Sequence, residues 1–342
     1  MKRVLALLMA LSIALLSGCG RQGASPVPPD PPVSPAGAAD TPGVLVRVAA
    51  LKGPTAMGLV GLMDAAAAGE ASENDYRFSL SGSADEITPQ LVKGGVDIAM
   101  VPANLAAVLH QNTEGGVQVI AVNTLGVLYL LERGDSVRSA EELRGRTIFA
   151  SGKGATPEIV LRYLLTQSGM DPDRDVDIQW KSEHAECLAA LLTTEGALAM
   201  LPQPFAAAAE LKNDEVRVAL DLNALWESLP KDGGGSALIT GAAVVRTAFA
   251  EEHPEAVSAF LKDYRQSVEW VNGSVSEAAQ RIESYGIIDA EAAEQALPAC
   301  HIVCITGMEM KGLLGGYLQV LYGQNPQSVG GALPGEGFFY VP

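Results

Sequence analysis

The chain is poor in the residues that nucleic acid binding requires. Among its 342 residues 23 are Lys or Arg and 40 are Asp or Glu, so the formal net charge is −17. Beyond the amino terminus, Lys and Arg do not form a cluster anywhere in the sequence. Because proteins hold phosphate backbones through clustered cations that release counterions, we exclude nucleic acid as a partner.

Long apolar runs are also scarce. The longest, residues 4–16, has 13 residues and follows the charged pair Lys2-Arg3. This length is too short to span a bilayer but is typical of the apolar part of a secretory signal. No later segment reaches 18 consecutive apolar residues. We therefore expect a soluble body outside the cytoplasm.

The end of this signal resembles that of bacterial lipoproteins. Small residues precede Cys19, which in such proteins becomes the lipidated first residue once the signal peptide is removed. This implies a signal peptide over 1–18 and a lipid anchor, by acylation with palmitate, to the bacterial cell membrane. Removing 1–18 takes away two basic residues and no acid, which leaves a charge of −19. The alternative is an ordinary signal peptide followed by a chance cysteine.

Residues 19–43 have the composition of a spacer. They contain seven prolines and few large apolar residues, so they cannot form a core and are expected to be extended. A lipidated cysteine followed by such a segment predicts a tether between a membrane surface and the domain that follows.

From residue 44 onward, apolar runs alternate with helix-forming segments. The expected strands are 44–51, 76–81, 96–101, 117–123 with 126–131 as its continuation, 146–150, 176–180, 196–201 and 237–245. Helical patterns of ten or more residues separate most of them, and this order is typical of parallel α/β sheets. A second series starts after Arg144-Gly145 and predicts two similar α/β units in tandem, ahead of a mostly helical carboxyl-terminal third.

The turns after the predicted strands carry the candidate ligand-binding residues. Most of these turns lead into a helix, whose first N–H groups are unpaired and carry partial positive charge, so several together favour an anionic or polar ligand. The candidates are Lys52, Gly53, Pro54, Thr55, Ser81, Ser83, Asn104, Thr124, Lys153, Gly154, Ala155, Thr156 and Gln203. Alternatively, the glycines and prolines form ordinary turns and the lysines are solvated.

Four segments give the sequence a family resemblance: AALKGPTAMG (49–58), DIAMVPAN (97–104), SGKGATPE (151–158) and ALAMLPQPF (197–205). With the lipoprotein signal, they resemble the extracytoplasmic solute-binding lipoproteins of ABC transporters, in the group that binds nitrate, taurine, alkanesulfonates or thiamine precursors. The resemblance implies a type II periplasmic-binding-protein fold with two lobes, each a mainly parallel sheet flanked by helices, and a ligand cleft between them. Lobe one would comprise 44–126 and 243–342, and lobe two 127–242.

The same resemblance implies a function. The protein would capture a small polar or anionic organic solute, such as a sulfonate, nitrate or carboxylate, and deliver it as a monomer to an ABC permease and its ATPase. Lys52 and Lys153 favour an anion or zwitterion. A thiamine-precursor pyrimidine or a similar heterocycle is the alternative ligand, although the aromatic content of 5% disfavours it slightly. An enzyme on the same scaffold and a surface sensor or adhesion module remain open as well.

Catalytic and metal-binding motifs are weak. Gly152-Lys153-Gly154-Ala155-Thr156-Pro157 approaches the dinucleotide fingerprint but has Pro157 in place of the third glycine. The four histidines are scattered, and among them only His184, close to Glu183 and Glu186, would suit an enzyme. Cys300 and Cys304 are free thiols, a disulfide, or metal ligands together with Cys187 or His184. We expect no catalytic residue, no metal and no cofactor.

Overall fold

The computed structural model describes residues 43–70, 73–229 and 236–341. The predicted signal peptide, Cys19 and the predicted tether up to residue 42 lie outside these residues, so all three stay predictions. Within the described ranges, none of the helices is both long enough and apolar enough to cross a bilayer.

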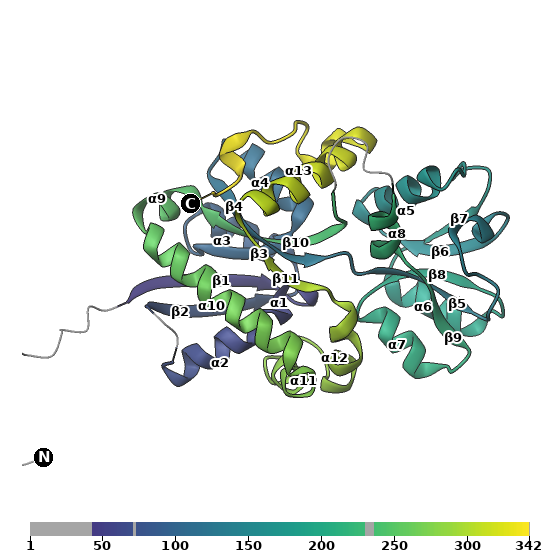
Figure 1. Cartoon of the computed structure of the whole chain (residues 1–342), viewed down its shortest axis with the longest axis horizontal. Coiled ribbons are helices and arrows are strands. Elements are labelled where there is room, and N and C mark those ends of the chain that lie inside the picture. The colour runs from purple at the N-terminus through teal and green to yellow at the C-terminus, as the bar shows by residue number, and fades with distance from the viewer. Residues whose placement is uncertain (1–42, 71–72, 230–235, 342) are drawn as a thin grey trace, which may run out of the picture. The chain divides into compact units, whose positions relative to one another are not determined.

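The first sheet of the described chain has six strands in the order β11-β4-β10-β3-β1-β2 (Figure 1). Its strands are β1 (Val44–Leu51), β2 (Asn74–Ser81), β3 (Ile98–Pro102), β4 (Val117–Leu125), β10 (Ile239–Arg246) and β11 (Ile302–Ile305). β1 pairs in parallel with β2 and β3, whereas β10 runs antiparallel to both β3 and β4. Strands β1 to β4 therefore share one direction.

The second sheet of the described chain has five strands in the order β7-β6-β8-β5-β9. Its strands are β5 (Leu128–Arg133), β6 (Thr147–Ser151), β7 (Asp177–Lys181), β8 (Leu198–Pro202) and β9 (Val216–Asp221). β6 pairs in parallel with β7 and β8, and β5 runs antiparallel to β8 and β9. The mainly parallel sheets predicted from the sequence are confirmed, each interrupted by an antiparallel strand.

Two of the antiparallel strands, β5 and β10, are those through which the chain crosses between the sheets, whereas β11, antiparallel to β4, lies at the edge of the first sheet. β4 leads directly into β5, and β9 is followed by a helix and then by β10. Because β5 and β10 run antiparallel to their neighbours, each starts at the edge of its sheet where the neighbouring strands end. The carboxyl ends of β1 to β4 and of β6 to β9 consequently lie at the crossing, where open α/β sheets place their binding loops.

Helices connect the strands and cover both sheets (Figure 1). They are α1 (Pro54–Met57), α2 (Val60–Ala68), α3 (Ala84–Val92), α4 (Ala103–Asn112), α5 (Thr156–Gln167), α6 (His184–Thr193), α7 (Phe205–Lys212), α8 (Leu222–Ser228), α9 (Thr247–Glu252), α10 (Pro254–Gly273), α11 (Val275–Ser284), α12 (Ala290–Ala296) and α13 (Gly307–Gln324). Short 3₁₀ turns occupy Ala140–Leu143, Leu297–Ala299, Pro326–Val329 and Glu336–Phe338. Local chemistry explains several starts: the Ser83 hydroxyl caps α3, and a proline lies in the first turn of α1, α5 and α10.

One prediction about strands was wrong, and two strands were missed. Residues 126–131 do not continue β4, because the chain turns at Gly126 and β5 belongs to the second sheet. A Cβ on Gly126 would lie 2.7 Å from both Asn223 Oδ1 and Leu238 Cδ2, so this backbone is packed tightly against neighbouring side chains. Strands β9 and β11 were not predicted.

β10 spans the lobe boundary that the sequence placed between residues 242 and 243. Gly241 and Ala242 pair with Pro102 and Val101 of β3, so residues 239–242 belong to the first sheet and not to the second. The apolar run 237–245 contains both the approach to the sheet and the strand itself, and its pattern does not mark where the crossing ends.

A buried carboxylate holds each sheet together at the end opposite the crossing. In the first sheet, fully buried Asp97 accepts hydrogen bonds of 2.8 Å from Arg47 and from Arg246. In the second sheet, fully buried Glu132 is paired with Arg146 at 3.2 Å and Arg217 at 2.8 Å. Both carboxylates are thus compensated by two guanidinium groups, as a buried charge requires.

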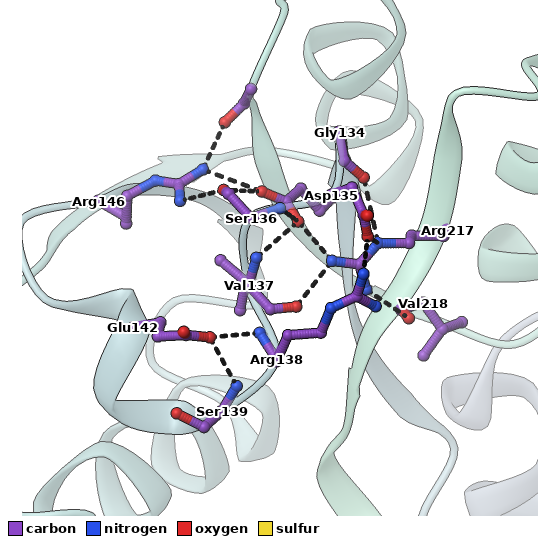
Figure 2. A network of polar contacts seen from close by, with 12 residues as sticks. Gly134, Asp135, Ser136, Val137, Arg138, Ser139, Glu142, Arg146, Arg217 and Val218 are labelled. Atoms are coloured by element: carbon purple, nitrogen blue, oxygen red, sulfur yellow. Dashed lines mark hydrogen bonds and ion pairs between the residues drawn. The ribbon is translucent and has the colours of Figure 1, made fainter.

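Figure 2 shows Arg146 and Arg217 on opposite sides of the turn Ser136-Val137, and both guanidinium groups donate to Glu132. The Ser136 and Val137 N–H groups each donate to Glu132 Oε2 at 2.9 Å, and the Ser136 hydroxyl donates to Oε1. These hydrogen bonds and ion pairs outweigh the cost of burial and lower the pKa of Glu132 to about 2.

Candidate functional site

A cavity of about 320 Å³ lies at the crossing between the two sheets. Its polar lining residues are Asn104, Thr156, His184, Thr240 and Tyr317. Its other lining residues are Pro102, Val127, Leu128, Ala155, Pro157, Val160, Pro202, Leu238 and Ile239. A concave, mostly apolar site with a few polar groups is typical of small-molecule binding sites.

Both halves of the chain contribute to this cavity. Asn104 lies in the first turn of α4, just after β3, and Thr240 lies on β10 of the same sheet. Thr156 and His184 are the first residues of α5 and α6, which follow strands of the second sheet. A molecule bound here would contact both halves at once.

Tyr317 of α13 forms the most deeply buried polar wall of the cavity. Its side chain is fully buried, with its ring 5.7 Å from that of Trp226 in α8. Burial raises the pKa of its hydroxyl well above the usual value, so the group stays protonated. Among the described residues nothing forms a hydrogen bond with this hydroxyl. It is available to a ligand.

His184 is held in one orientation by the second sheet. Its Nδ1 lies 2.6 Å from the hydroxyl oxygen of Ser151, at the end of β6, and its ring lies 5.3 Å from that of Phe205. Burial lowers the pKa of His184, which favours the neutral imidazole. The neighbouring Glu186 accepts a hydrogen bond of 2.9 Å from the Ser182 N–H and thereby caps the start of α6.

Three of the predicted ligand-binding residues line the cavity: Asn104, Ala155 and Thr156. Lys153 and Gly154 precede them in the same turn and are exposed. The Gly154 N–H donates to Glu158 Oε2 at 2.6 Å.

A second group of predicted residues lies beside β1 and β2, away from the cavity lining. The exposed Lys52 donates its backbone N–H to the Ser81 carbonyl oxygen at 2.9 Å, and Gly53 and Pro54 continue the turn into α1. Ser83 caps α3. The turn after β1 thus lies beside the end of β2, and whether these residues contact a ligand stays a prediction.

The remaining candidates are buried in the interior. Gln203 is 5% exposed, and its side-chain oxygen accepts from the Ala207 N–H at 3.2 Å, which caps α7. Thr55 and Thr124 lie close to Gly241, around the side chain of Asn123. Among the described residues, Asn123 Oδ1 and Thr124 Oγ1 have no hydrogen-bond partner.

Several lining residues were missed or assigned another role. His184 was considered for an enzyme or as a metal ligand but not for ligand binding, whereas Thr240 and Tyr317 were not considered at all. Thr240 follows a glycine-rich segment and Tyr317 lies within a long helix, and neither position has the strand-then-turn pattern used for the other candidates. Only the fold brings α13 next to the starts of α4 and α5.

A larger hollow of about 600 Å³ lies on the outside of the first half of the chain, between α2, α10 and α11. Its lining includes Asp64, whose carboxylate is paired with Arg281 at 2.8 Å. It receives no residue from the second sheet, so a ligand there would not bridge the two halves. We therefore take the smaller cavity as the candidate site.

The cysteines of the described part are free. Cys187 and Cys300 are buried and Cys304 is partly buried, so the disulfide alternative for Cys300 and Cys304 is not formed. Burial raises the pKa of Cys300 to about 12. Among the described residues, no three His, Cys, Asp or Glu side chains are grouped closely enough to hold a metal ion.

Solved structures share this fold. An ABC transporter protein from Parabacteroides distasonis is 24% identical, with a TM-score of 0.71 over 87% of this chain and 99% of its own. The periplasmic aliphatic sulphonate-binding protein SsuA from Escherichia coli is 15% identical, with a TM-score of 0.67 over 87% of this chain and 92% of its own. The alkanesulfonate-binding protein SsuA from Xanthomonas axonopodis pv. citri, bound to MOPS, is 13% identical, with a TM-score of 0.58 over 86% of this chain and 96% of its own. No curated protein matches the chain in sequence.

A family model matches residues 66–296, which is more than half of the chain. Its description is ABC transporter, phosphonate, periplasmic substrate-binding protein. The fold of the solved structures and the two sheets of this chain agree with this match. The resemblance to solute-binding proteins of ABC transporters, which the sequence showed, is confirmed. The chain therefore belongs to the phosphonate-type family of periplasmic substrate-binding proteins of ABC transporters.

Proposed function

We propose that this protein captures a small organic solute in the cavity between its two sheets and delivers it to a membrane permease. The observation that carries the proposal is the origin of the lining: Asn104, Thr240 and Tyr317 belong to the first half, and Thr156 and His184 belong to the second. A solute that contacts both halves stabilises the state in which they are closed around it.

The proposed lobes follow the two sheets. Lobe one comprises 44–125 and 239–341, and lobe two comprises 128–229. The connection at Gly126 and Val127 would serve as a hinge, since it separates β4 from β5. Asn223 Oδ1 accepts from the Gly126 N–H at 3.3 Å, and His301 Nδ1 lies 2.5 Å from the Gly126 carbonyl oxygen. These contacts support a hinge with a defined geometry.

The setting follows from the family and from the sequence. A periplasmic binding protein works outside the cytoplasm, with a permease and an ATPase that complete the import system. We further propose that Cys19 carries the lipid that holds the protein at the membrane, that residues 19–43 form the tether, and that the protein acts as a monomer. The small residues before Cys19 and the prolines after it support the anchor and the tether.

The experiment is thermal unfolding of the purified protein against a panel of sulfonates, phosphonates, nitrate, carboxylates, amino acids, amides and pyrimidines. A ligand at 100 times its Kd stabilises the folded state by about 2.7 kcal/mol, which gives a visible increase in Tm. We expect a saturable increase with one chemical class and recovery of that compound unchanged. Chemical conversion of the compound would instead favour the alternative of an enzyme on this scaffold.

A further inference from the structure

The lining of the cavity carries no formal charge. Among the described residues that form it there is no Lys, Arg, Asp or Glu. The polar groups are one amide, three hydroxyls and the imidazole of His184, whose burial favours its neutral form. An anion transferred from water into such a site would lose its hydration without gaining a cation, which is costly.

The lysines near the strand ends do not compensate for this. Lys52 and Lys153 are exposed and are not part of the lining. The ammonium group of Lys181, at the end of β7, lies 5.1 Å from the centre of the Phe149 ring. None of these three cations faces the cavity as a wall residue.

The helix starts in the second half are already occupied by carboxylates of the chain. Glu158 accepts from the Gly154 N–H at the start of α5, at 2.6 Å, and Glu186 accepts from the Ser182 N–H at the start of α6, at 2.9 Å. Each carboxylate offsets the partial positive charge of its helix terminus. A further anion at either helix start would meet a negative charge within the same turn.

The Tyr317 hydroxyl is an uncharged hydrogen-bonding group in the cavity wall. The Tyr317 side chain is buried and lines the cavity, and its hydroxyl makes no hydrogen bond with another described residue. A buried polar group without a partner is unfavourable, so the site gains when a ligand supplies an acceptor or donor. The walls around it, including Val127, Val160 and Leu238, are apolar.

We propose that the solute is an uncharged organic molecule with an apolar body and amide-like or hydroxyl groups that pair with Tyr317, Thr156 and Asn104. Phosphonates, sulfonates and carboxylates are excluded as the preferred class. This inference rests on the proposed function and narrows its ligand. It also departs from the expectation of an anion that Lys52 and Lys153 suggested.

The test uses a bacterial metabolite extract separated by ion exchange into neutral and anionic fractions, each added to the purified protein in thermal unfolding. We expect the neutral fraction to raise the Tm and the anionic fraction to leave it unchanged. Stabilisation by the anionic fraction alone overturns the inference and leaves the proposed function intact. Stabilisation by neither fraction contradicts both.

Matched pairs then measure the preference for charge: benzamide against benzoate, and benzenesulfonamide against benzenesulfonate. We expect the uncharged member of a pair to bind at least about tenfold more tightly than the anion, because the anion would lose its hydration without gaining a cation. An anion that binds more tightly than its uncharged counterpart overturns the inference. Pairs in which neither member binds also count against it, since the site is expected to accept the uncharged molecules.

Two variants link the preference to the residues named. Tyr317→Phe keeps the ring and removes the unpartnered hydroxyl, so the protein should fold while its affinity for the neutral ligand falls by about tenfold. The matched control is Tyr163→Phe, whose ring packs on Trp226 outside the lining.

The double variant Glu158→Gln and Glu186→Gln should gain affinity for benzenesulfonate, whereas unchanged rejection of this anion would show that the two glutamates do not set the preference.

Discussion

The Tyr129 hydroxyl donates a hydrogen bond of 2.7 Å to the Ala299 carbonyl oxygen, 170 residues further along the chain. Tyr129 belongs to β5 of the second sheet, and Ala299 ends the 3₁₀ turn that precedes β11 of the first. Two residues beyond Ala299, the His301 carbonyl oxygen accepts from the Leu125 N–H at 3.1 Å. A third segment of the chain therefore holds the crossing between β4 and β5.

Replacing Tyr129 by Phe removes this bond and keeps the aromatic packing. We expect the free energy of unfolding to fall by about 0.5–1.5 kcal/mol, the usual net value of one hydrogen bond. Chemical denaturation followed by circular dichroism measures the change. Tyr322→Phe is the control, because its hydroxyl makes no hydrogen bond among the described residues. Equal stability of the two variants would mean that the bond across the crossing contributes nothing.

Glu132→Gln should be among the most destabilising single changes in the second half. The substitution leaves Arg146 and Arg217 beside a neutral, fully buried amide. Breaking a buried ion pair on one side costs about 3–5 kcal/mol. Glu215→Gln is the control: this glutamate pairs with Arg133 but its side chain is 67% exposed, so its loss should cost less than about 1 kcal/mol. A loss of the same size in both variants would contradict the buried network.

The same carboxylate predicts a pH dependence of stability. Its pKa is lowered from 4.5 to about 2 in the folded protein, so the unfolded chain takes up a proton first as the pH falls. The stabilisation is present above pH 4.5 and is lost as the pH falls toward 2. Free energies of unfolding measured across this range should decline more steeply for the wild type than for Glu132→Gln. Parallel curves would show that Glu132 is not the group responsible.

Gly241→Ala should disrupt the junction of β4 and β10. A Cβ at this position would lie 2.2 Å from Asn123 Oδ1 and 2.6 Å from Thr55 Cγ2, which no ordinary contact allows. Because these side chains are buried, we expect a loss of about 1–3 kcal/mol, as for other overpacked cores. The Tm in a thermal unfolding scan reports it.

Gly323→Ala, in the helix α13, is the matched control for this substitution. Nothing lies within 4 Å of its added Cβ, and alanine favours helix by about 0.8–1.0 kcal/mol over glycine. This variant should therefore be slightly more stable than the wild type. A Gly241→Ala protein as stable as Gly323→Ala would contradict the close approach around Asn123.

Sequence patterns were sufficient where structure is local. The first strand, Val44–Leu51, was predicted with its observed bounds. The strand Val216–Asp221 was missed because it is short and mostly half-buried, with no strong alternation. The separation of β4 from β5 depends on packing around Gly126 that a continuous apolar run does not reveal.

The candidate site was predictable only in part, for the same reason. Asn104 and Thr156 follow strands directly, and their position at the strand ends identified them. Tyr317 reaches the cavity from a helix more than 150 residues away in sequence, and only tertiary packing determines that placement. The charge around the site also depends on the fold. The sequence shows Lys153 close to Thr156, but it does not show that the Glu158 carboxylate accepts a hydrogen bond from the intervening Gly154 N–H.

The most direct test of the account is whether a solute occupies the cavity between the two sheets. Ala155 lines the cavity but is exposed, so Ala155→Trp should fill the opening without disturbing the fold. Ala189→Trp places the same side chain on an exposed position of α6 outside the lining. Equilibrium dialysis of both variants and the wild type against the metabolite extract, with mass spectrometry of the retained compound, should show retention by the wild type and Ala189→Trp and none by Ala155→Trp. Equal retention by all three proteins would contradict the account.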